Sequence, residues 1–361
     1  MNKKKFDCLL LLLTILLAFI GIALIYSAGR GIKTELSNLA SRQMVWTAIG
    51  IFLLFLFYSL PYRSLRKASY PLYLLSLLLL LLVLLIGKGR AGSSRWLIFG
   101  GLYFQPSEFA KLIFILVAAR YLADIGKKMK RFFFLIPYFI LIGIPFLLIL
   151  KQPNLGTALV LLPISLGLLW VAGIRKKHLI FLIILGFLFS PILWFTVLKD
   201  YQRARLLVFI NPNADPLGSG YNVIQSRIAI GSGGLFGKGY LQGTQSHLAF
   251  LPEYHTDFIF CVLAEEWGFI GGGALLFLYF LFLRQLVRIA TSTSEPFARL
   301  VTSGIAVMFA SHIFINIGMT LGMLPVAGLP LPFLSYGGSS LLIFLISVGI
   351  VLNIKKSETM F

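Results

Sequence analysis

Ten long apolar runs, separated by short charged or Pro/Gly-containing segments, constrain this chain more than any other feature of its sequence. An α-helix needs roughly 20 apolar residues to cross about 30 Å of hydrocarbon, and backbone inside lipid must satisfy its own hydrogen bonds. The runs are Leu9–Tyr26, Met44–Leu60, Tyr70–Ile86, Phe109–Leu122, Phe132–Leu150, Leu155–Ala172, Leu179–Leu198, Phe258–Leu283, Leu300–Leu321 and Phe333–Ile354. They predict an all-α polytopic integral membrane protein of about ten transmembrane helices.

Composition agrees with this assignment. The 361 residues are 58% hydrophobic and only 12% charged, whereas roughly a quarter of a soluble domain is charged. Ten spans leave little chain for anything else, so we expect a single transmembrane domain over residues 1–361. The first run is too long for a cleaved signal peptide and lacks a small-residue cleavage site. Cys8 and Cys261 would lie at different depths in the membrane, which argues against a disulfide.

The distribution of Lys and Arg assigns the connections to sides, because retained cytoplasmic loops are enriched in these residues. One set of alternate connections holds eighteen of the 32, the opposite set holds twelve, and Lys111 and Arg120 fall within the fourth run. The richer set, which includes both termini, is predicted to be cytoplasmic. It consists of Lys3, Lys4, Lys5, Arg63, Arg66, Lys67, Lys127, Lys128, Lys130, Arg131, Arg175, Lys176, Lys177, Arg284, Arg288, Arg299, Lys355 and Lys356.

One long connection, residues 199–256 between the seventh and eighth runs, is external by this count. Turn-forming residues are dense at 211–220 and 231–239, which argues against long helices within it. Connections of this length are usually functional or disordered. The apolar residues spaced along this one favour an ordered lid that lies along the membrane.

The glycine-rich stretch Gly231–Gly239 invites comparison with a phosphate-binding loop but does not match the pattern. A P-loop needs a glycine where Ser232 stands and a serine or threonine at Gly239, and the dinucleotide pattern fails at Phe236. The aspartates show no D-x-D spacing, and the four histidines show no zinc-binding spacing. We therefore expect no bound nucleotide, metal or other cofactor and no nucleic-acid partner, and leave open whether a divalent cation assists.

The predicted outer ends of the helices share one device. Four of the five helices that start outside are entered through a proline and polar residues, at 105–108, 152–154, 252–257 and 330–332. Proline suits a first helical turn, where its missing N–H would be unpaired anyway. The N-terminus of a helix carries a partial positive charge. The outer face is therefore predicted to favour anions.

Ionisable residues inside the predicted spans are informative because such groups are usually paired or functional. Glu108 and Lys111 lie one helical turn apart, so they form either a mutually neutralising pair or a site for a polar headgroup. On a helix that runs through Asp257, Glu265 lies about 80° around the axis from it and Glu266 about 180°. Glu265 is thus expected to share a cavity with Asp257, and Glu266 to face another helix.

Several outer-face residues each have two interpretations. Asp257 is either a helix cap or, with His255 nearby, a catalytic group. Arg203 and Arg205 are either interfacial cations that extend toward water or bidentate phosphate ligands. Trp96 is either an anchor at the membrane interface or a platform that stacks on a sugar.

The sequence around Asp257 resembles the SEDS (shape, elongation, division and sporulation) family. Asn154 departs from the family, which commonly has an aspartate there, and an amide cannot accept a proton. The match spans nearly the whole chain, and Gly237–Gly239, Gly243–Ser246 and Asn316–Met319 favour the elongation branch of the family. The segments that carry the resemblance are Gln105–Lys111, Gly218–Tyr221, Ile228–Gly234, Leu251–Phe260, Ala264–Glu266 and Leu334–Ser339.

The resemblance implies an inverting peptidoglycan glycosyltransferase that polymerises lipid II, an undecaprenyl-diphosphate-linked disaccharide, into β-1,4 glycan strands. The reaction is expected on the outer face of the cytoplasmic (inner) membrane of a bacterium, with Asp257 as general base. The candidate substrate-binding residues are Glu108, Lys111, Arg203, Arg205, Trp96, His255, Glu265 and Ser335.

The resemblance also implies partners. These are a class B penicillin-binding protein, which is a transpeptidase, the nascent glycan strand, and other membrane proteins of the elongation complex. Two alternatives stay open on the residues themselves. One is a flippase that moves lipid II across the membrane, and the other is a noncatalytic scaffold for the penicillin-binding protein.

Overall fold

The computed structural model describes residues 7–30, 38–87, 95–99, 102–196, 200–212, 215–216, 218, 220–248 and 250–358. Ten helices occupy the ten apolar runs, and they are α1 (Cys8–Gly29), α2 (Leu39–Ser59), α3 (Tyr62–Ile86), α4 (Pro106–Ile125), α5 (Ile136–Lys151), α6 (Leu155–Ala172), α7 (Lys176–Thr196), α11 (Ile259–Ser292), α12 (Pro296–Thr320) and α13 (Gly338–Glu358). Within the described residues, eight of them are long and apolar enough to cross a membrane, α5 when it is counted from Phe132. The other two are α7 and α4, which carries buried charges.

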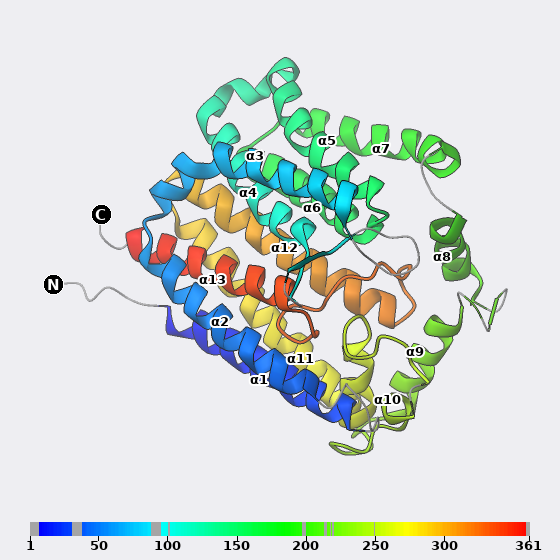
Figure 1. Cartoon of the computed structure of the whole chain (residues 1–361). Coiled ribbons are helices and arrows are strands. Elements are labelled where there is room, and N and C mark those ends of the chain that lie inside the picture. The colour runs from blue at the N-terminus through cyan, green and yellow to red at the C-terminus, as the bar shows by residue number, and fades with distance from the viewer. Residues whose placement is uncertain are drawn as a thin grey trace.

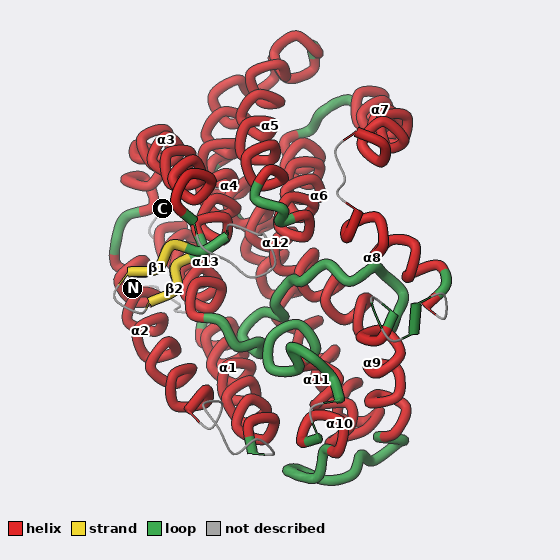
Figure 2. Tube along the Cα trace, turned by 45° about the vertical axis from the view of Figure 1, so that its right-hand side comes forward, coloured by secondary structure: helices red, strands yellow, loops and turns green. Residues whose placement is uncertain are grey.

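Short elements lie in the connections. Strands β1 (Leu97–Phe99) and β2 (Leu102–Phe104) pair antiparallel before α4. Two 3-10 turns, η2 (Gly126–Lys130) and η3 (Phe132–Leu135), join α4 to α5. In Figure 2 the strands lie near the start of α4, among red helices that make up most of the trace.

The long connection between α7 and α11 contains three helices, α8 (Asp200–Ile210), α9 (Tyr221–Ser232) and α10 (Thr244–His247). Its turn-forming residues limit the length of these helices. The connection nevertheless contains more helix than the density of turn-forming residues predicted. The physical reason is tertiary packing, because α9 lies against α11 and α12 and buries Val223 and Ala229. The predicted lid is therefore an ordered chain of short helices.

Helix α12 lies in the middle of the bundle and contacts α4, α6, α11 and α13 (Figure 1). Helix α13 packs mainly against α2, and glycines let the backbones of these two helices approach closely. A Cβ at Gly349 would lie 2.4 Å from Leu54 O, and a Cβ at Gly50 would lie 2.2 Å from Leu345 Cδ1. Small residues at such contacts are how helices pack in lipid, where exclusion of water adds no driving force.

The start of α1, the α11–α12 junction and the end of α13 lie at one end of the bundle (Figure 1). Gln285 Nε2 donates to Asp7 Oδ2 at 2.5 Å, and Ser294 Oγ donates to Glu358 Oε2 at 3.2 Å. An even number of crossings places both ends of the helical chain on one side.

The outer helix starts follow the proline rule only in part. Pro106 opens α4, and Asn154 is the N-cap of α6. However, α11 begins at Ile259 and α13 at Gly338, after the prolines expected in their first turns. Hydrogen bonds from side chains of α12 satisfy backbone carbonyls in the segments before these helices, so both segments are stable without helical bonds.

Helix α11 is interrupted at Gly268, where φ is 68°. The glycine-rich stretch fills the break, because it accepts from the two amides after the break and donates to two carbonyls before it. The bonds run from Phe269 N to Gly234 O (2.9 Å), from Ile270 N to Leu235 O (3.1 Å), from Lys238 N to Glu265 O (3.0 Å) and from Gly239 N to Glu266 O (2.9 Å). The glycine-rich stretch does not match a phosphate-binding loop. It instead supplies the hydrogen-bond partners that the backbone of an interrupted membrane helix would otherwise lack.

Candidate functional site

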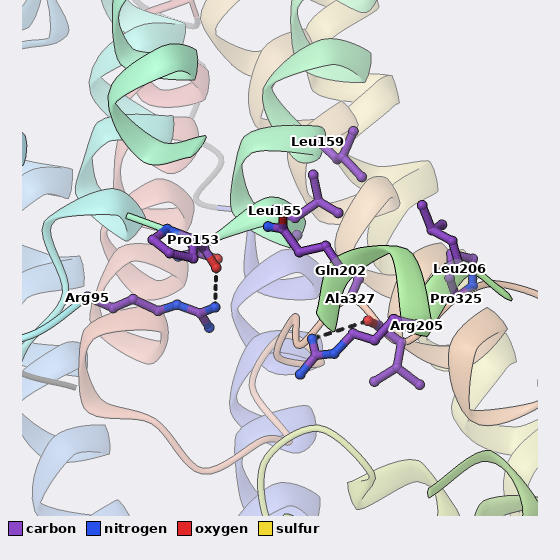
Figure 3. Close-up of a pocket in the computed structure, with 12 residues that line it drawn as sticks. Arg95, Pro153, Leu155, Leu159, Gln202, Arg205, Leu206, Pro325 and Ala327 are labelled. Carbon is purple, nitrogen blue, oxygen red and sulfur yellow. Dashed lines mark hydrogen bonds between the residues drawn. The ribbon is translucent and has the colours of Figure 1, made fainter. Parts of the chain in front are cut away.

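A pocket opens where α6 begins, between α8 and the connection from α12 to α13 (Figure 3). Gly156 is needed in its wall, because a Cβ there would lie 2.1 Å from Ala327 O. Four segments that are far apart in the sequence form the pocket. The lining residues are Arg95, Pro153, Asn154, Leu155, Gly156, Leu159, Gln202, Arg205, Leu206, Pro325, Val326 and Ala327.

Two arginines and a helix N-terminus make this pocket electropositive. Arg95 donates to Pro153 O, and Arg205 Nη1 donates to Val326 O at 3.5 Å (Figure 3). Asn154 caps α6 by accepting from the Thr157 amide at 3.4 Å. An aspartate at the cap would cancel part of the positive potential of the helix end, whereas the amide preserves it. The pocket is therefore suited to an anion.

Asp257 lies on the segment before α11 and is not the helix cap that one interpretation expected. The N-cap of α11 is Phe258, and no side chain caps the helix. Within the described part of the chain, no group donates a hydrogen bond to the Asp257 carboxylate. It lies beside Gly328, where a Cβ would be 3.4 Å from Asp257 Oδ2. A carboxylate to which none of the described residues donates is available to accept a proton.

Electrostatics join Asp257 to the pocket. Burial raises the pKa of the Asp257 carboxyl to about 6, and the neighbouring Glu253 also raises it. Arg205 and Arg95 act in the opposite direction and lower the pKa. The carboxylate is therefore within electrostatic reach of both pocket arginines. Above pH 6 it is ionised, and it is a stronger base than an ordinary aspartate.

The backbone before Asp257 is tied to the α12–α13 connection. The Tyr336 amide donates to His255 O at 2.9 Å, and Ser335 Oγ donates to Thr256 O at 2.5 Å. Ser335 Oγ also accepts a backbone N–H of the same connection at 2.8 Å. Ser335, a predicted substrate ligand, is buried and uses its one proton on the bond to Thr256.

Three other residues predicted to bind substrate make contacts within the protein. His255 packs against Tyr336 with ring centroids 5.9 Å apart, and burial lowers its pKa, so the ring is neutral at pH 7. Trp96 packs edge-on against Tyr103 at 6.3 Å. Arg203 donates to two carbonyls at the end of α7, at 2.9 and 3.0 Å. It ties α8 to α7 and does not line the pocket.

Glu108 and Lys111 form the mutually neutralising pair that one interpretation expected. Lys111 Nζ lies 3.0 Å from each Glu108 carboxylate oxygen and 2.7 Å from His312 Nε2. His312 Nδ1 faces Pro330 O at 3.1 Å, and since a carbonyl only accepts, Nδ1 carries the proton and Nε2 accepts from Lys111. The three ammonium protons of Lys111 thus have partners, and its side chain is fully buried.

The angle predicted between Asp257 and Glu265 does not apply, because α11 starts after Asp257. Glu265 accepts from Lys238 Nζ at 2.7 Å and from the Thr244 amide at 2.8 Å, so it anchors the lid to α11. Glu266 accepts from Ser27 of α1, which agrees with the expectation that it faces another helix.

Sequence reasoning missed three residues of the site. Arg95 precedes Trp96 in the sequence and was assigned no role there, because only the fold shows that it lines the pocket. His312 and Asn316 lie four residues apart in an apolar run, so they share one face of α12. Two polar residues at that spacing in a membrane span were a signal that could have identified them.

That the protein binds no metal stays a prediction rather than a finding. Within the described residues, no group of three or more His, Cys, Asp or Glu side chains could hold a metal ion. The expectation of no protein-bound metal therefore has to be tested in solution, by measuring activity with and without a chelator.

Comparison with known proteins extends over nearly the whole chain. The family model FTSW_RODA_SPOVE, described as "Cell cycle protein", matches residues 7–360. The peptidoglycan glycosyltransferase MrdB of Escherichia coli K12 is 39% identical over 99% of this chain and 97% of its own.

Two solved structures share the fold. One, described as "Structural coordination of polymerization and crosslinking by a peptidoglycan synthase complex", matches with a TM-score of 0.84 and 37% identity over 99% of each chain. The other is the rod shape determining protein RodA of Thermus thermophilus, with a TM-score of 0.73 and 34% identity over 99% of each chain.

Proposed function

Since this chain belongs to the SEDS family, the FtsW/RodA/SpoVE family of cell cycle proteins, we infer that it is a peptidoglycan glycosyltransferase. Its proposed active site is the Arg95/Arg205 pocket together with Asp257. One observation carries this assignment. Asp257 is a carboxylate with a raised pKa, without a hydrogen-bond donor in the described residues, and under the influence of two arginines that line one pocket.

The proposed substrate is lipid II, whose sugar is α-linked to undecaprenyl diphosphate. A β-1,4 product requires inversion at the anomeric carbon. The 4-hydroxyl of the acceptor attacks that carbon while the bond from the carbon to the diphosphate oxygen breaks. Asp257 takes the hydroxyl proton, and the diphosphate leaves with the electron pair of the broken bond.

The pocket supports the leaving group in this proposal. Negative charge grows on the bridging oxygen as the bond breaks, so cations that lie close to it stabilise the transition state more than the ground state. Arg95, Arg205 and the N-terminus of α6 supply that positive potential. Lys111 was a third candidate, but its protons are engaged by Glu108 and His312, so we assign it to the support of the bundle.

We place the reaction on the outer face of the inner membrane, because the loop charges put the α11 start and the pocket on the side opposite both termini. The proposed partner is a class B penicillin-binding protein that cross-links the strands. The similarity to a chain of a peptidoglycan synthase complex that combines polymerization and crosslinking supports this pairing. A role in cell elongation is supported by the similarity to the rod shape determining protein.

The test is strand synthesis from lipid II by purified protein in detergent. Asp257→Asn keeps the shape of the side chain and removes proton acceptance, so we expect synthesis to fall by about 10²- to 10⁴-fold. Asp215→Asn is the matched control, because this carboxylate lies in the same external segment and accepts from the Gly218 amide at 3.0 Å, which an asparagine oxygen can also do.

The outcomes separate the function classes. A flippase without two leaflets makes no polymer in detergent, so wild-type synthesis there rules out transport as the sole activity. Unimpaired synthesis by Asp257→Asn would show that Asp257 is not the base, and equal losses in both variants would point to a general defect of the external segment.

A further inference from the structure

The side chain of Asn316 joins the backbone of the proposed base to the segment that packs against its carboxylate. Asn316 Nδ2 donates to Asp257 O at 2.9 Å and to Leu329 O at 2.7 Å. The residue has no exposed surface, and it lies on α12, the central helix. Leu329 follows Gly328, the residue beside the Asp257 carboxylate. The amide group of Asn316 therefore holds both Asp257 and the segment that packs against its carboxylate.

Asn316 is one of three donors that hold consecutive carbonyls around Asp257. His255 O accepts from the Tyr336 amide, Thr256 O accepts from Ser335 Oγ, and Asp257 O accepts from Asn316. Of these, the bond from Asn316 is the one made to the residue that carries the reactive group. It is also the one that comes from a membrane helix rather than from the flanking connection.

His312 adds a second tie to the same connection from the next turn of α12. Its Nδ1–H donates to Pro330 O at 3.1 Å, so His312 and Asn316 hold successive carbonyls, those of Pro330 and Leu329. The opposite ring nitrogen of His312 accepts from Lys111, which is neutralised by Glu108. A buried polar chain thus connects α4 and α12 to the loop beside the base.

We propose that Asn316 is a positioning residue for the glycosyl transfer. By donating to Asp257 O and Leu329 O together, it holds the Asp257 carboxylate against Gly328 and so fixes both its direction and its exposure to water. This proposal rests on the assignment of Asp257 as the general base. It requires no contact between Asn316 and the substrate.

The geometry predicts a specific kinetic signature. A base displaced by about 1 Å from its productive position can lose about 10²-fold in rate while binding is retained. We therefore expect Asn316→Ala to lower kcat for strand synthesis by about 10- to 100-fold, with KM for lipid II within about threefold of wild type. Water would also reach the carboxylate more easily, so the acid limb of the pH–rate profile should move to lower pH.

A matched control exists at the opposite end of the bundle. Asn353 on α13 is also a buried asparagine that bridges backbone groups, since Nδ2 donates to Tyr58 O at 2.6 Å and Oδ1 accepts from the Tyr62 amide at 3.0 Å. Asn353→Ala removes bonds of the same kind far from Asp257. It should lower thermal stability and leave kcat and the acid limb at wild-type values.

A second variant covers the possibility that Asn316→Ala fails to fold. Asn316→Asp keeps the shape, yet a carboxyl group, protonated or ionised, cannot donate both bonds, so kcat should fall here as well. The proposal is overturned if a folded Asn316 variant retains wild-type kcat and acid limb, or if Asn353→Ala matches its loss. The proposed function fails separately, through Asp257→Asn, so the two outcomes are distinguishable.

Discussion

At the scale of single residues, hydrogen-bond partners distinguish Asp257 from the other ionisable residues predicted for the site. Lys111 and Glu265 have their bonding capacity taken up by Glu108, His312 and the lid. Asp257 is half-buried and is the one of these three that lacks a donor within the described residues, and a carboxylate whose pKa is raised to about 6 is suited to proton transfer.

The pH dependence of strand synthesis should show this carboxylate directly. A general base works in its ionised form, and the pKa of Asp257 is about 6, so the rate should fall about tenfold per pH unit below 6. Glu253 raises that pKa, so Glu253→Gln should move the acid limb to lower pH. Initial rates between pH 4.5 and 8, with kcat and KM separated, measure both effects. An acid limb that does not respond to Glu253→Gln would show that another group titrates.

The two arginines of α8 should behave differently when removed. Arg205 lines the pocket and lowers the pKa of Asp257, whereas Arg203 bonds to the end of α7. Arg205→Ala should weaken the use of lipid diphosphate by about 10-fold or more in kcat/KM and shift the acid limb to higher pH, with partner binding intact. Arg203→Ala, its matched control, should leave the acid limb in place. Identical kinetics in the two variants would argue against a phosphate role for Arg205.

At the scale of elements, the sequence was sufficient to predict the long helices but not to predict where a helix is interrupted. Hydropathy located all ten long helices, because a long apolar run in lipid satisfies its backbone by forming a helix. It did not show the break at Gly268, since the residues around it remain apolar and the missing bonds come from Gly234–Gly239, some 30 residues earlier in the chain. For the same reason the starts of α11 and α13 were placed too early.

The break in α11 predicts how substitutions of its glycines affect stability. A Cβ at Gly268 would lie 2.3 Å from the Gly237 amide nitrogen, and φ there is 68°. Gly268→Ala should therefore destabilise the protein by about 1–3 kcal/mol or more, through backbone strain and loss of the lid contact. Gly273→Ala on the same helix is the control, because nothing lies within 4 Å of its Cβ position. Thermal unfolding in detergent compares the two, and equal melting temperatures would contradict the account of the break.

At the scale of the whole molecule, the sequence could place the candidate site on one face but could not assemble it. Loop charges and proline-rich helix starts predicted that polar groups gather on the outer side. The pocket itself combines Arg95, the α6 start, Arg205 and residues 325–327, and no periodicity links segments so far apart. The sequence offered the Glu108–Lys111 pair as one of two interpretations, but it could not show that His312 also contacts Lys111 or that Glu265 and Ser335 bond to the protein, because those partners come from distant elements.

The most direct measurement is a structure of the protein with a non-reactive lipid II analogue bound. The account predicts the diphosphate between Arg95, Arg205 and the N-terminus of α6, and a sugar hydroxyl within about 3.2 Å of the Asp257 carboxylate. A headgroup bound elsewhere, with Asp257 facing no sugar hydroxyl and the two arginines away from the phosphates, would contradict it.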